Sequence, residues 1–229
     1  MDSRRIAYLR ALDVDVWERR GLAPTAEAAP PVTLPGSVEQ PGWAELERAV
    51  KTCTLCALHK TRTQGVFGVG NRNAQWMVIG EAPGADEDRQ GEPFVGRAGQ
   101  LLNSMLKAIG LKREQVFIAN ILKSRPPNNR DPKPEEVQAC IPYLFRQIEL
   151  VNPKLILCVG RIAAQTLLET DTPIGKLRGQ LHRIAGNRPM VVTYHPAYLL
   201  RSPGEKRKSW ADLLLALRTF EQAAGGAPT

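Results

Sequence analysis

The sequence predicts a three-layer α/β/α domain with a central, mainly parallel four-stranded sheet. Four short segments are apolar almost without interruption, which is typical of strands that helices cover on both faces; they span residues 75–80, 116–122, 154–160 and 189–194. Longer segments with apolar residues at helical spacing lie between and after them, at residues 99–109, 134–151, 161–168 and 204–222. This alternation favours a parallel sheet, because a helix carries the chain back across the sheet between strands.

The composition is that of a globular domain with a basic surface. Of the 229 residues, 43% are hydrophobic and 24% are charged, which excludes a disordered chain. No apolar run approaches the roughly 20 residues of a membrane helix, and the N-terminus lacks the apolar stretch of a signal peptide, so we expect a cytoplasmic protein. The formal net charge of +8 is consistent with solubility or with a polyanionic partner such as nucleic acid.

Two segments precede the main domain. Residues 4–20 place apolar side chains at helical spacing with charges between them, so we expect an amphipathic helix within residues 1–21. Residues 22–42 are rich in Ala and Pro and contain no basic residue, which is typical of a linker. The main domain then spans residues 43–222 and carries the basic excess, and residues 223–229 are expected to form a flexible tail.

The chain has four cysteines, two of which form the chelating pair CTLC. Structural disulfides are not expected in a cytoplasmic chain, and a thioredoxin-like pair would follow a strand, which this pair does not. The spacing favours a four-thiolate centre without choosing between zinc and an iron–sulfur cluster; its ligands would be Cys53, Cys56, Cys140 and Cys158. The alternative is that Cys140 and Cys158 are ordinary buried core residues.

The residues with chemical potential lie in loops that follow the strands, where parallel α/β sheets carry their sites. Glu81 comes directly after the first strand, in a glycine-rich loop where Gly84 allows a ligand to approach the backbone. The loop also holds a cluster of carboxylates, which argues against a phosphate cradle, and we expect Asp86 and Asp88 to belong to a solvated acidic turn. Phe94, in GEPFVG, is either a stacking platform for a flat heterocycle or a plug onto the core.

Two later strands also end in polar residues. Asn120 interrupts an apolar strand, so its side-chain amide either pairs with an imide-like edge or starts a turn. His195 directly follows the last strand and precedes a proline, which restricts its backbone. Residues suited to contact DNA phosphates or to wedge between bases follow both strands; they are Lys123, Arg125, Arg130, Leu199, Leu200 and Arg201.

Three motifs and the cysteines occur together in this chain: GEAPG…GEPFVGRAG…LL at residues 80–102, NILKSRPPNNR at 120–130 and HPAYLLR at 195–201. In this combination they closely resemble the family 4 uracil-DNA glycosylases, the iron–sulfur branch of the uracil-DNA glycosylase superfamily, over about residues 43–222. The resemblance implies a uracil-DNA glycosylase-like fold and uracil-containing DNA, single- or double-stranded, as the partner. The implied reaction is hydrolysis of the N-glycosidic bond of a flipped uracil, which leaves an abasic site. The cysteines are implied to bind a [4Fe–4S] cluster.

The resemblance also implies roles for single residues. His195 is expected to stabilise the departing uracil anion at O2, and Glu81 to position water and stabilise the cationic sugar. Asn120 is expected to bind the O4 and N3–H edge of uracil, whose pattern cytosine reverses, and Phe94 to stack on the ring. Glu87 is implied to lie near the C5 side of the base, where the methyl group of thymine would clash.

The chain departs from related branches at two places. Ala82, expected with Gly84 to line the base pocket, stands where the best-known branch of the superfamily has a water-activating aspartate. Glu81 must therefore reach the same water or act electrostatically. A related branch that bonds covalently to DNA has a basic, His-containing insertion after the acidic loop, which residues 88–94 lack. Turnover rather than trapping is therefore expected.

Alternatives remain open at this stage. A glycosylase for other deaminated bases would differ in pocket width, which the sequence does not show. A non-catalytic, metal-stabilised DNA-binding module would share the basic loops and cysteines, but it has no need of a carboxylate facing its polyanion. A cofactor-dependent oxidoreductase ranks last, because no dinucleotide fingerprint is present. We further expect a monomer, an N-terminal helix that contacts a repair or replication protein, and association with the nucleoid in a prokaryote.

Overall fold

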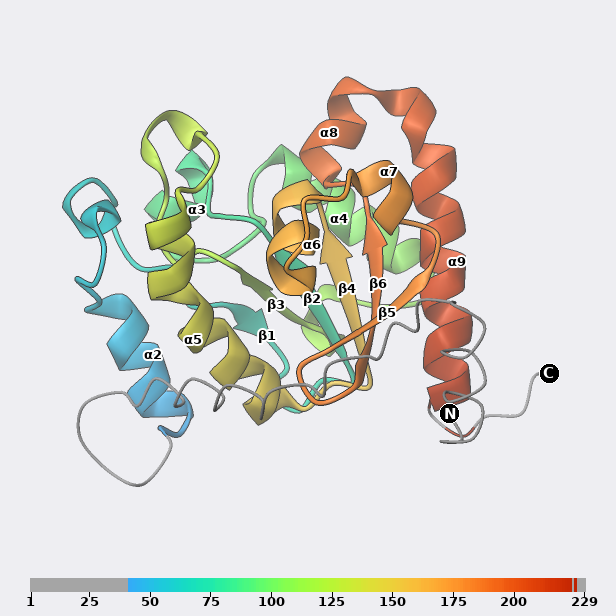
Figure 1. Cartoon of the computed structure of the whole chain (residues 1–229), viewed down its shortest axis with the longest axis horizontal. Helices are drawn as coiled ribbons and strands as arrows, with labels where there is room; N and C mark the ends of the chain where they lie inside the picture. The colour runs from blue at the N-terminus through green and yellow to red at the C-terminus, as the bar shows by residue number, and fades with distance from the viewer. Residues whose placement is uncertain (1–40, 224, 226–229) are drawn as a thin grey trace, which may run out of the picture. The chain divides into compact units, whose positions relative to one another are not determined.

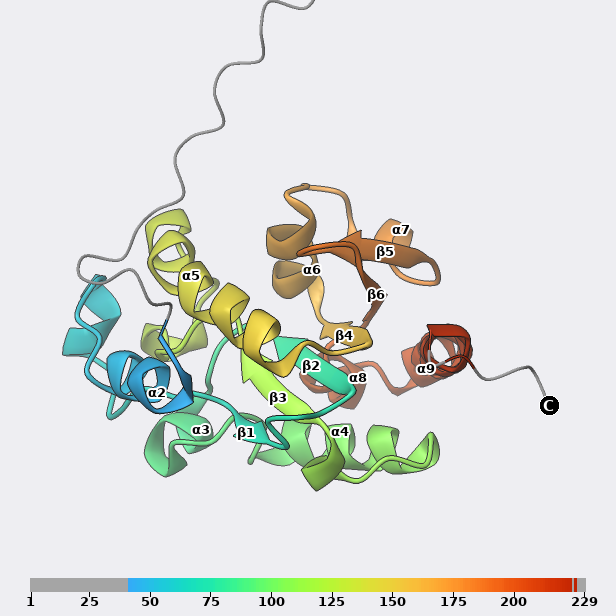
Figure 2. The same cartoon turned by 90° about the horizontal axis from the view of Figure 1, so that it is seen from below.

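The computed structural model describes residues 41–223 and residue 225. These residues form a six-stranded sheet with helices on both of its faces (Figures 1 and 2). The expected N-terminal helix at 1–21, nearly all of the expected linker and most of the expected tail lie outside the described residues. None of the described helices has the length and hydropathy required to cross a membrane.

The sheet has the strand order β1-β3-β2-β4-β6-β5. Its four central strands run parallel to one another; they are β2 (Trp76–Gly80), β3 (Phe117–Asn120), β4 (Leu155–Val159) and β6 (Arg188–Thr193). The apolar runs predict these same strands, and every predicted boundary falls within two residues of the observed one. The mainly parallel sheet is therefore confirmed.

The predicted number of four strands is wrong, because a short antiparallel strand is added at each edge. β1 (Val69–Gly70) pairs with β3, and β5 (Leu181–Ile184) pairs with β6. β1 has only two residues, and β5 buries a single residue of its four. Neither strand therefore forms the apolar run that identifies a strand in the sequence.

Two apolar clusters fill the two faces of the sheet. Met77 and Ile79 of β2 point into one cluster, while Trp76 and Val78 point into the other, as the two-residue period of a strand requires. The first face is covered by α2 (Trp43–Lys51), α5 (Pro134–Val151), α6 (Arg161–Leu168) and α7 (Ile174–Leu177). The second is covered by α4 (Arg97–Ala108), α8 (Pro196–Arg201) and α9 (Lys206–Ala223). Figure 2 shows these three layers edge-on.

The long helices agree with the sequence periodicity. α5 and α6 have the predicted bounds, and α4 and α9 begin or end within two residues of them. α5 starts at Pro134, and the Glu136 carboxylate accepts a hydrogen bond from the Lys133 amide at 2.9 Å, which satisfies one free N–H group of the first turn. Several shorter elements were not predicted; they include α3 (Ala85–Gln90), η1 (Ala57–Lys60), η2 (Arg113–Gln115), η3 (Pro127–Asn129) and η4 (Pro203–Glu205).

Candidate active site

A cavity of about 740 Å³ opens at the carboxyl ends of the four parallel strands. Each strand delivers a lining residue at or just after its last position: Glu81 follows β2, Asn120 ends β3, Gly160 follows β4 and His195 follows β6. Phe94 joins them from the loop between α3 and α4. The rule that parallel sheets build their sites at this edge therefore holds, and the residues singled out by the strand-end argument share one cavity.

Glu81 is a carboxyl group in a low-polarity position. Its pKa is raised to about 7, mainly by burial and in smaller part by the Asp131 carboxylate, while the Arg161 guanidinium opposes both effects. Asp131 and Arg161 also line the cavity and form an ion pair of 2.6 Å. Glu81 therefore exchanges its proton near neutral pH, so its charge is available to the site only above that range.

His195 is held as a neutral imidazole with a defined tautomer. Its pKa is lowered to about 4, mainly by burial and in smaller part by the Arg201 guanidinium, while the Glu87 carboxylate opposes both effects. Its Nδ1 accepts a hydrogen bond from the Ala197 amide at 3.1 Å, where His195 is the N-cap of α8. Because Nδ1 acts as an acceptor, the single ring proton of the neutral form resides on Nε2, which makes that atom a hydrogen-bond donor.

Phe94 adopts a strained backbone conformation against the end of β2. Its φ of 55° is in the left-handed region, at a cost of about 1–2 kcal/mol for a residue with a Cβ. The ring stacks on His195 with 5.6 Å between centroids and 29° between planes. A Cβ at Gly80 would lie 2.5 Å from both Phe94 Cζ and Asn120 Oδ1, so the ring and the amide can approach the strand end only because residue 80 is glycine.

Asn120 has a buried acceptor that no group of the described chain satisfies. The residue is 3% exposed and lines the cavity, and its Oδ1 has no hydrogen-bond partner. Its backbone carbonyl accepts a hydrogen bond from Lys123 Nζ at 2.8 Å, which fixes the end of β3. Leaving a buried acceptor unpaired costs about 1–3 kcal/mol, so such a group is evidence of a ligand that supplies the missing donor.

The acidic loop is more ordered than the sequence indicated. Ala82, Gly84 and Glu87 line the cavity, as the resemblance implied for the base pocket. The Glu87 carboxylate accepts hydrogen bonds from the amides of Gly84, Val95 and Gly96 at 3.0–3.1 Å. The expected solvated turn is wrong for Asp88, which is 3% exposed and accepts a hydrogen bond from the Thr63 amide at 2.9 Å.

Two of the predicted DNA contacts are contradicted by burial. Lys123 is 1% exposed, and its ammonium group donates to Gln147 Oε1 at 2.6 Å as well as to Asn120 O, so it faces the core and not a phosphate. Leu199 is also 1% exposed and packs in the core cluster with α4 and α9, so it is not a wedge at the surface. A basic or apolar residue in a loop appears exposed from sequence alone, because its burial depends on elements far along the chain.

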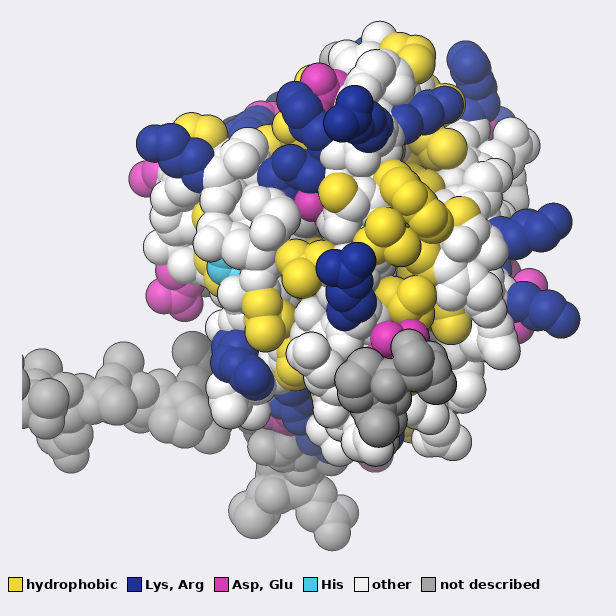
Figure 3. All heavy atoms as spheres, turned by 90° about the vertical axis from the view of Figure 1, so that its right-hand side faces the viewer, with side chains coloured by type: hydrophobic (Ala, Val, Ile, Leu, Met, Phe, Trp, Pro, Cys, Tyr) yellow, Lys and Arg dark blue, Asp and Glu magenta, His cyan; other side chains and the backbone are white. Residues whose placement is uncertain are grey.

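The other predicted DNA contacts border the cavity or lie close to it. Arg201 and Arg130 line the cavity, although Arg130 makes a bidentate ion pair with Glu136 at 2.6 and 2.9 Å. Arg125 donates to Asn129 Oδ1 at 2.8 Å, and Leu200 is only partly buried. Figure 3 shows Lys and Arg side chains gathered at the upper end of one face, where α8 and the start of α9 lie in Figure 1.

Several lining residues of this cavity were not predicted from the sequence; they include Asp131, Arg161 and Tyr194. Arg161 follows Gly160 at the end of β4, and Tyr194 directly follows β6, so the strand-end rule would have selected both. Tyr198 lies on α8, and its ring contacts that of Tyr194 with 5.0 Å between centroids.

The predicted four-cysteine centre does not fit the structure. Cys53 and Cys56 lie near Cys140: the pKa of the Cys140 thiol is raised to about 11, mainly by burial, which Lys123 opposes, and in smaller part by the charges of the other two thiols. Cys158 feels burial alone, which raises its pKa. Among the described residues, no group of three or more His, Cys, Asp or Glu side chains is arranged to hold a metal ion.

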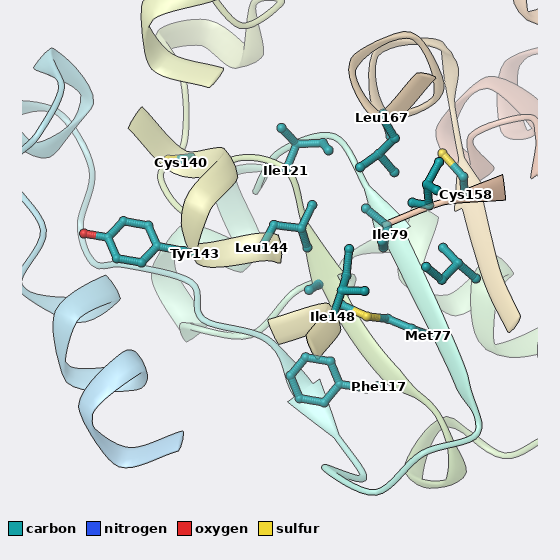
Figure 4. Close-up of a cluster of buried hydrophobic side chains, with 14 of the residues drawn as sticks. Met77, Ile79, Phe117, Ile121, Cys140, Tyr143, Leu144, Ile148, Cys158 and Leu167 are labelled. Atoms are coloured by element: carbon teal, nitrogen blue, oxygen red, sulfur yellow. The ribbon is translucent and has the colours of Figure 1, made fainter. Parts of the chain in front are cut away.

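The topology explains why Cys158 stands apart. It lies on β4 opposite Ile79 of β2, which in turn pairs with Ala119 of β3, and α5 with Cys140 packs beside β3. Two strand spacings of about 4.8 Å therefore separate Cys158 from β3 within the sheet. Figure 4 shows apolar side chains, Ile79 and Ile121 among them, between the two cysteines. Its assignment as a metal ligand is wrong, and Cys158 is a core residue.

Comparison with known proteins agrees with this site. The family model of the uracil DNA glycosylase superfamily matches residues 67–215. The type-4 uracil-DNA glycosylase of Archaeoglobus fulgidus is 49% identical over 175 residues, which is 73% of this chain and 88% of that protein. The type-4 enzyme of Pyrobaculum aerophilum is 44% identical over 178 residues, 75% and 91% of the two chains. The type-4 enzyme of Thermotoga maritima is 46% identical over 154 residues, 67% and 80%. This chain therefore belongs to the uracil-DNA glycosylase superfamily, as a member of its type-4 family.

Proposed function

We propose that this protein is a monofunctional uracil-DNA glycosylase, which binds a uracil flipped out of DNA and hydrolyses its N-glycosidic bond. The unpaired Oδ1 of Asn120 carries the proposal. In uracil, N3–H is a donor for this oxygen and O4 is an acceptor for the Asn120 amide N–H. In cytosine, an unprotonated N3 and an amino group reverse both partners, so the same amide rejects it.

The remaining lining residues supply the chemistry of bond cleavage. As the bond from C1′ to N1 breaks, its electron pair moves onto uracil, and the charge is shared with O2. The Nε2–H group of neutral His195 donates to this oxygen, where it stabilises the anion without a change in its own protonation state. A water molecule adds to C1′, and the proton that it releases is returned to the base.

Glu81 acts on the sugar side of the reaction. Its ionised carboxylate stabilises the positive charge that develops at C1′ and orients the attacking water, which Ala82 cannot do with its methyl group. Phe94 provides the stacking surface for the ring. The carboxylate of Glu87 already accepts hydrogen bonds from backbone amides. Its proposed role at the C5 side of the base is therefore indirect, through the loop that it holds in place.

DNA is proposed to bind across the rim of the cavity. Arg161 and Arg201 are exposed there, and Arg125 lies on the neighbouring loop, so these guanidinium groups are assigned to phosphates and the partly buried Leu200 to the space left by the flipped base. We also propose that the protein acts as a monomer. We further propose residues 43–222 as the catalytic domain, a nucleoid location set by the substrate, and a protein partner for residues 1–21.

The resemblance also implies an iron–sulfur cluster. The thiols of Cys53, Cys56 and Cys140 lie near one another, whereas Cys158 lies apart from them on β4. A [4Fe–4S] cluster bound by four cysteines is not supported. No step of the proposed reaction passes through a metal.

The test is incubation with end-labelled oligonucleotides that each contain one modified base, followed by alkali. Cleavage at uracil in single- or double-stranded DNA, without cleavage at thymine or cytosine, is the expected result. Cleavage at hypoxanthine or xanthine but not at uracil would replace the proposal with a glycosylase for other deaminated bases. Binding without cleavage of any of these substrates would support a non-catalytic DNA-binding module.

A further inference from the structure

The strained loop around Phe94 is held from its carbonyl side by one guanidinium group. Arg113, in η2, donates from Nη2 to Pro93 O at 2.5 Å and from Nη1 to Phe94 O at 3.1 Å. The same Nη1 lies 3.4 Å from Asn103 Oδ1 on α4. Arg113 does not line the cavity, so its contacts with the site run through the backbone of this loop.

The amide side of the loop is held by a group of opposite charge. Glu87 accepts hydrogen bonds from the amides of Val95 and Gly96, directly after the carbonyls that Arg113 binds. Gly99 of α4 lies so close that a Cβ there would be 1.8 Å from Phe94 O. Four consecutive residues, 93–96, are therefore fixed by two side chains and one helix backbone.

From this geometry we infer that Arg113 is a positioning residue for base excision: it keeps Phe94 in its left-handed conformation, and so keeps the ring where uracil stacks. The inference rests on the proposed function. The ring position matters because Phe94 contacts Gly80 and His195 at the base of the cavity, next to the Asn120 amide. If the ring rotates out of this position, the His195 imidazole and the Asn120 amide lose the side chain that packs beside them.

Arginine suits this role better than lysine. A planar guanidinium donates to two carbonyls at once, whereas an ammonium group acts as a single point. The charge is also placed in a partly buried position, which lowers the pKa of Arg113 from its ordinary value, while the carboxylates of Glu92, Glu114 and Glu87 oppose that effect. The guanidinium therefore stays charged while it binds the two carbonyls.

The experiment is a double-mutant cycle on uracil excision, with single-turnover rates of R113Q, F94A and the double variant. We expect R113Q to lower the rate by about tenfold and F94A by more, and the double variant to match F94A within about twofold, because Arg113 acts through Phe94. R113K is expected to fall between wild type and R113Q. The Kd for an oligonucleotide with a tetrahydrofuran abasic site should not change in R113Q, because that ligand has no base to stack.

R188Q is the matched control, because Arg188 also donates to a backbone carbonyl, that of Ala185, in a hairpin outside the cavity. Its rate should equal the wild-type rate. The inference would be overturned if R113Q excised uracil at the wild-type rate. It would also be overturned if R113Q lowered the rate by the same factor in the F94A background as in the wild-type background. If the wild type does not excise uracil, the proposed function fails, and hydrogen exchange of residues 93–97 then decides: faster exchange in R113Q supports the positioning role, and unchanged exchange rejects it.

Discussion

Asn120 combines deep burial with an unpaired acceptor, and this combination separates it from the other polar groups around the cavity. Glu87 and Asp88 are also buried, but backbone amides satisfy their carboxylates. His195 has its Nδ1 satisfied by Ala197. A protein that keeps an unsatisfied acceptor at the end of a central strand gives up stability there, and the missing donor is expected from the substrate.

The first prediction follows from that unpaired oxygen. N120A should lower kcat/KM for uracil excision by about 100-fold or more, because the variant loses both hydrogen bonds to the base edge. Its free energy of unfolding should change by less than about 1 kcal/mol, since loss of an unpaired acceptor offsets the small cavity that is left. Single-turnover kinetics and urea unfolding measure the two quantities. A wild-type rate would contradict the role of Asn120 in base recognition.

Glu81 gives the reaction a pH dependence. Its pKa is about 7, so the carboxylate needed at the sugar forms as the pH rises through 7, and the excision rate should rise over that range and level off above it. E81Q should be slow at every pH, without this rise. Lys123 has its pKa lowered to about 7 by burial, so a rise that persists in E81Q would assign the titration to Lys123 instead.

The same carboxyl group makes an opposite prediction for stability. A raised pKa means that the folded protein favours protonated Glu81, which therefore contributes to the free energy of unfolding. This stabilising contribution is complete below pH 4.5 and is lost as the pH rises through 7. E81Q should therefore stabilise the fold relative to wild type by about 1–3 kcal/mol at pH 8.5 and by little at pH 4.5. Thermal unfolding of both proteins at the two pH values measures the difference. Equal shifts at both pH values would contradict the burial of this charge.

At the scale of single residues, the sequence predicted where the site residues lie in the fold better than it predicted which side chains are buried. Glu81, Asn120 and His195 were found because each stands next to an apolar strand, and parallel strands bring their ends together. Lys123 was misplaced because its partner Gln147 lies on α5, which no local pattern connects to the loop. The hydrogen bonds from Arg113 to the Phe94 loop could not be predicted from the sequence either, because Arg113 is distant in sequence and its partners there are backbone carbonyls.

At the scale of elements, predictability followed length and burial. The four central strands are buried at every position or nearly so, and the long helices have one apolar face, so both give strong periodic signals. β1, β5 and α3 are short, and they are ordered by partners in other segments. α3 in particular depends on Asp88, whose carboxylate binds the backbone near Thr63. Such elements are determined by tertiary contacts and not by their own sequence.

The end of β2 provides a test at this scale. In G80A, the new methyl group would lie 2.5 Å from Phe94 Cζ and Asn120 Oδ1, so the ring and the amide must move apart. The excision rate should fall by at least about tenfold, and the fold should lose about 1–3 kcal/mol by overpacking. G175A is the control, because no atom beyond the neighbouring residues and the backbone of α7 lies within 4 Å of the corresponding methyl position. A G80A enzyme with the wild-type rate would show that the strand end does not need this close contact.

At the scale of the whole molecule, the fold places its reactive groups at the carboxyl ends of the parallel strands. Three of its four thiols lie elsewhere, around the Cys140 position on α5. Cys53 and Cys56 precede the first strand, and Cys140 lies on α5. Arg62 links this region to the sheet, because it donates to Ser124 Oγ at 2.7 Å and to Cys53 O at 2.9 Å. The segment before the sheet is thus attached to the loop after β3 through this side chain.

The separation of Cys158 from the other thiols makes the last prediction. C158A should leave the iron content per chain of the purified protein equal to that of wild type, because the residue is fully buried on β4 and lies away from Cys140. C53S and C140S should lower that content if a cluster is bound, and the absorbance near 400 nm should fall with it. Elemental analysis and absorption spectra measure both. Loss of iron in C158A alone, with a native circular dichroism spectrum, would return Cys158 to the ligand set and require β4 and α5 to approach each other more closely than the sheet allows.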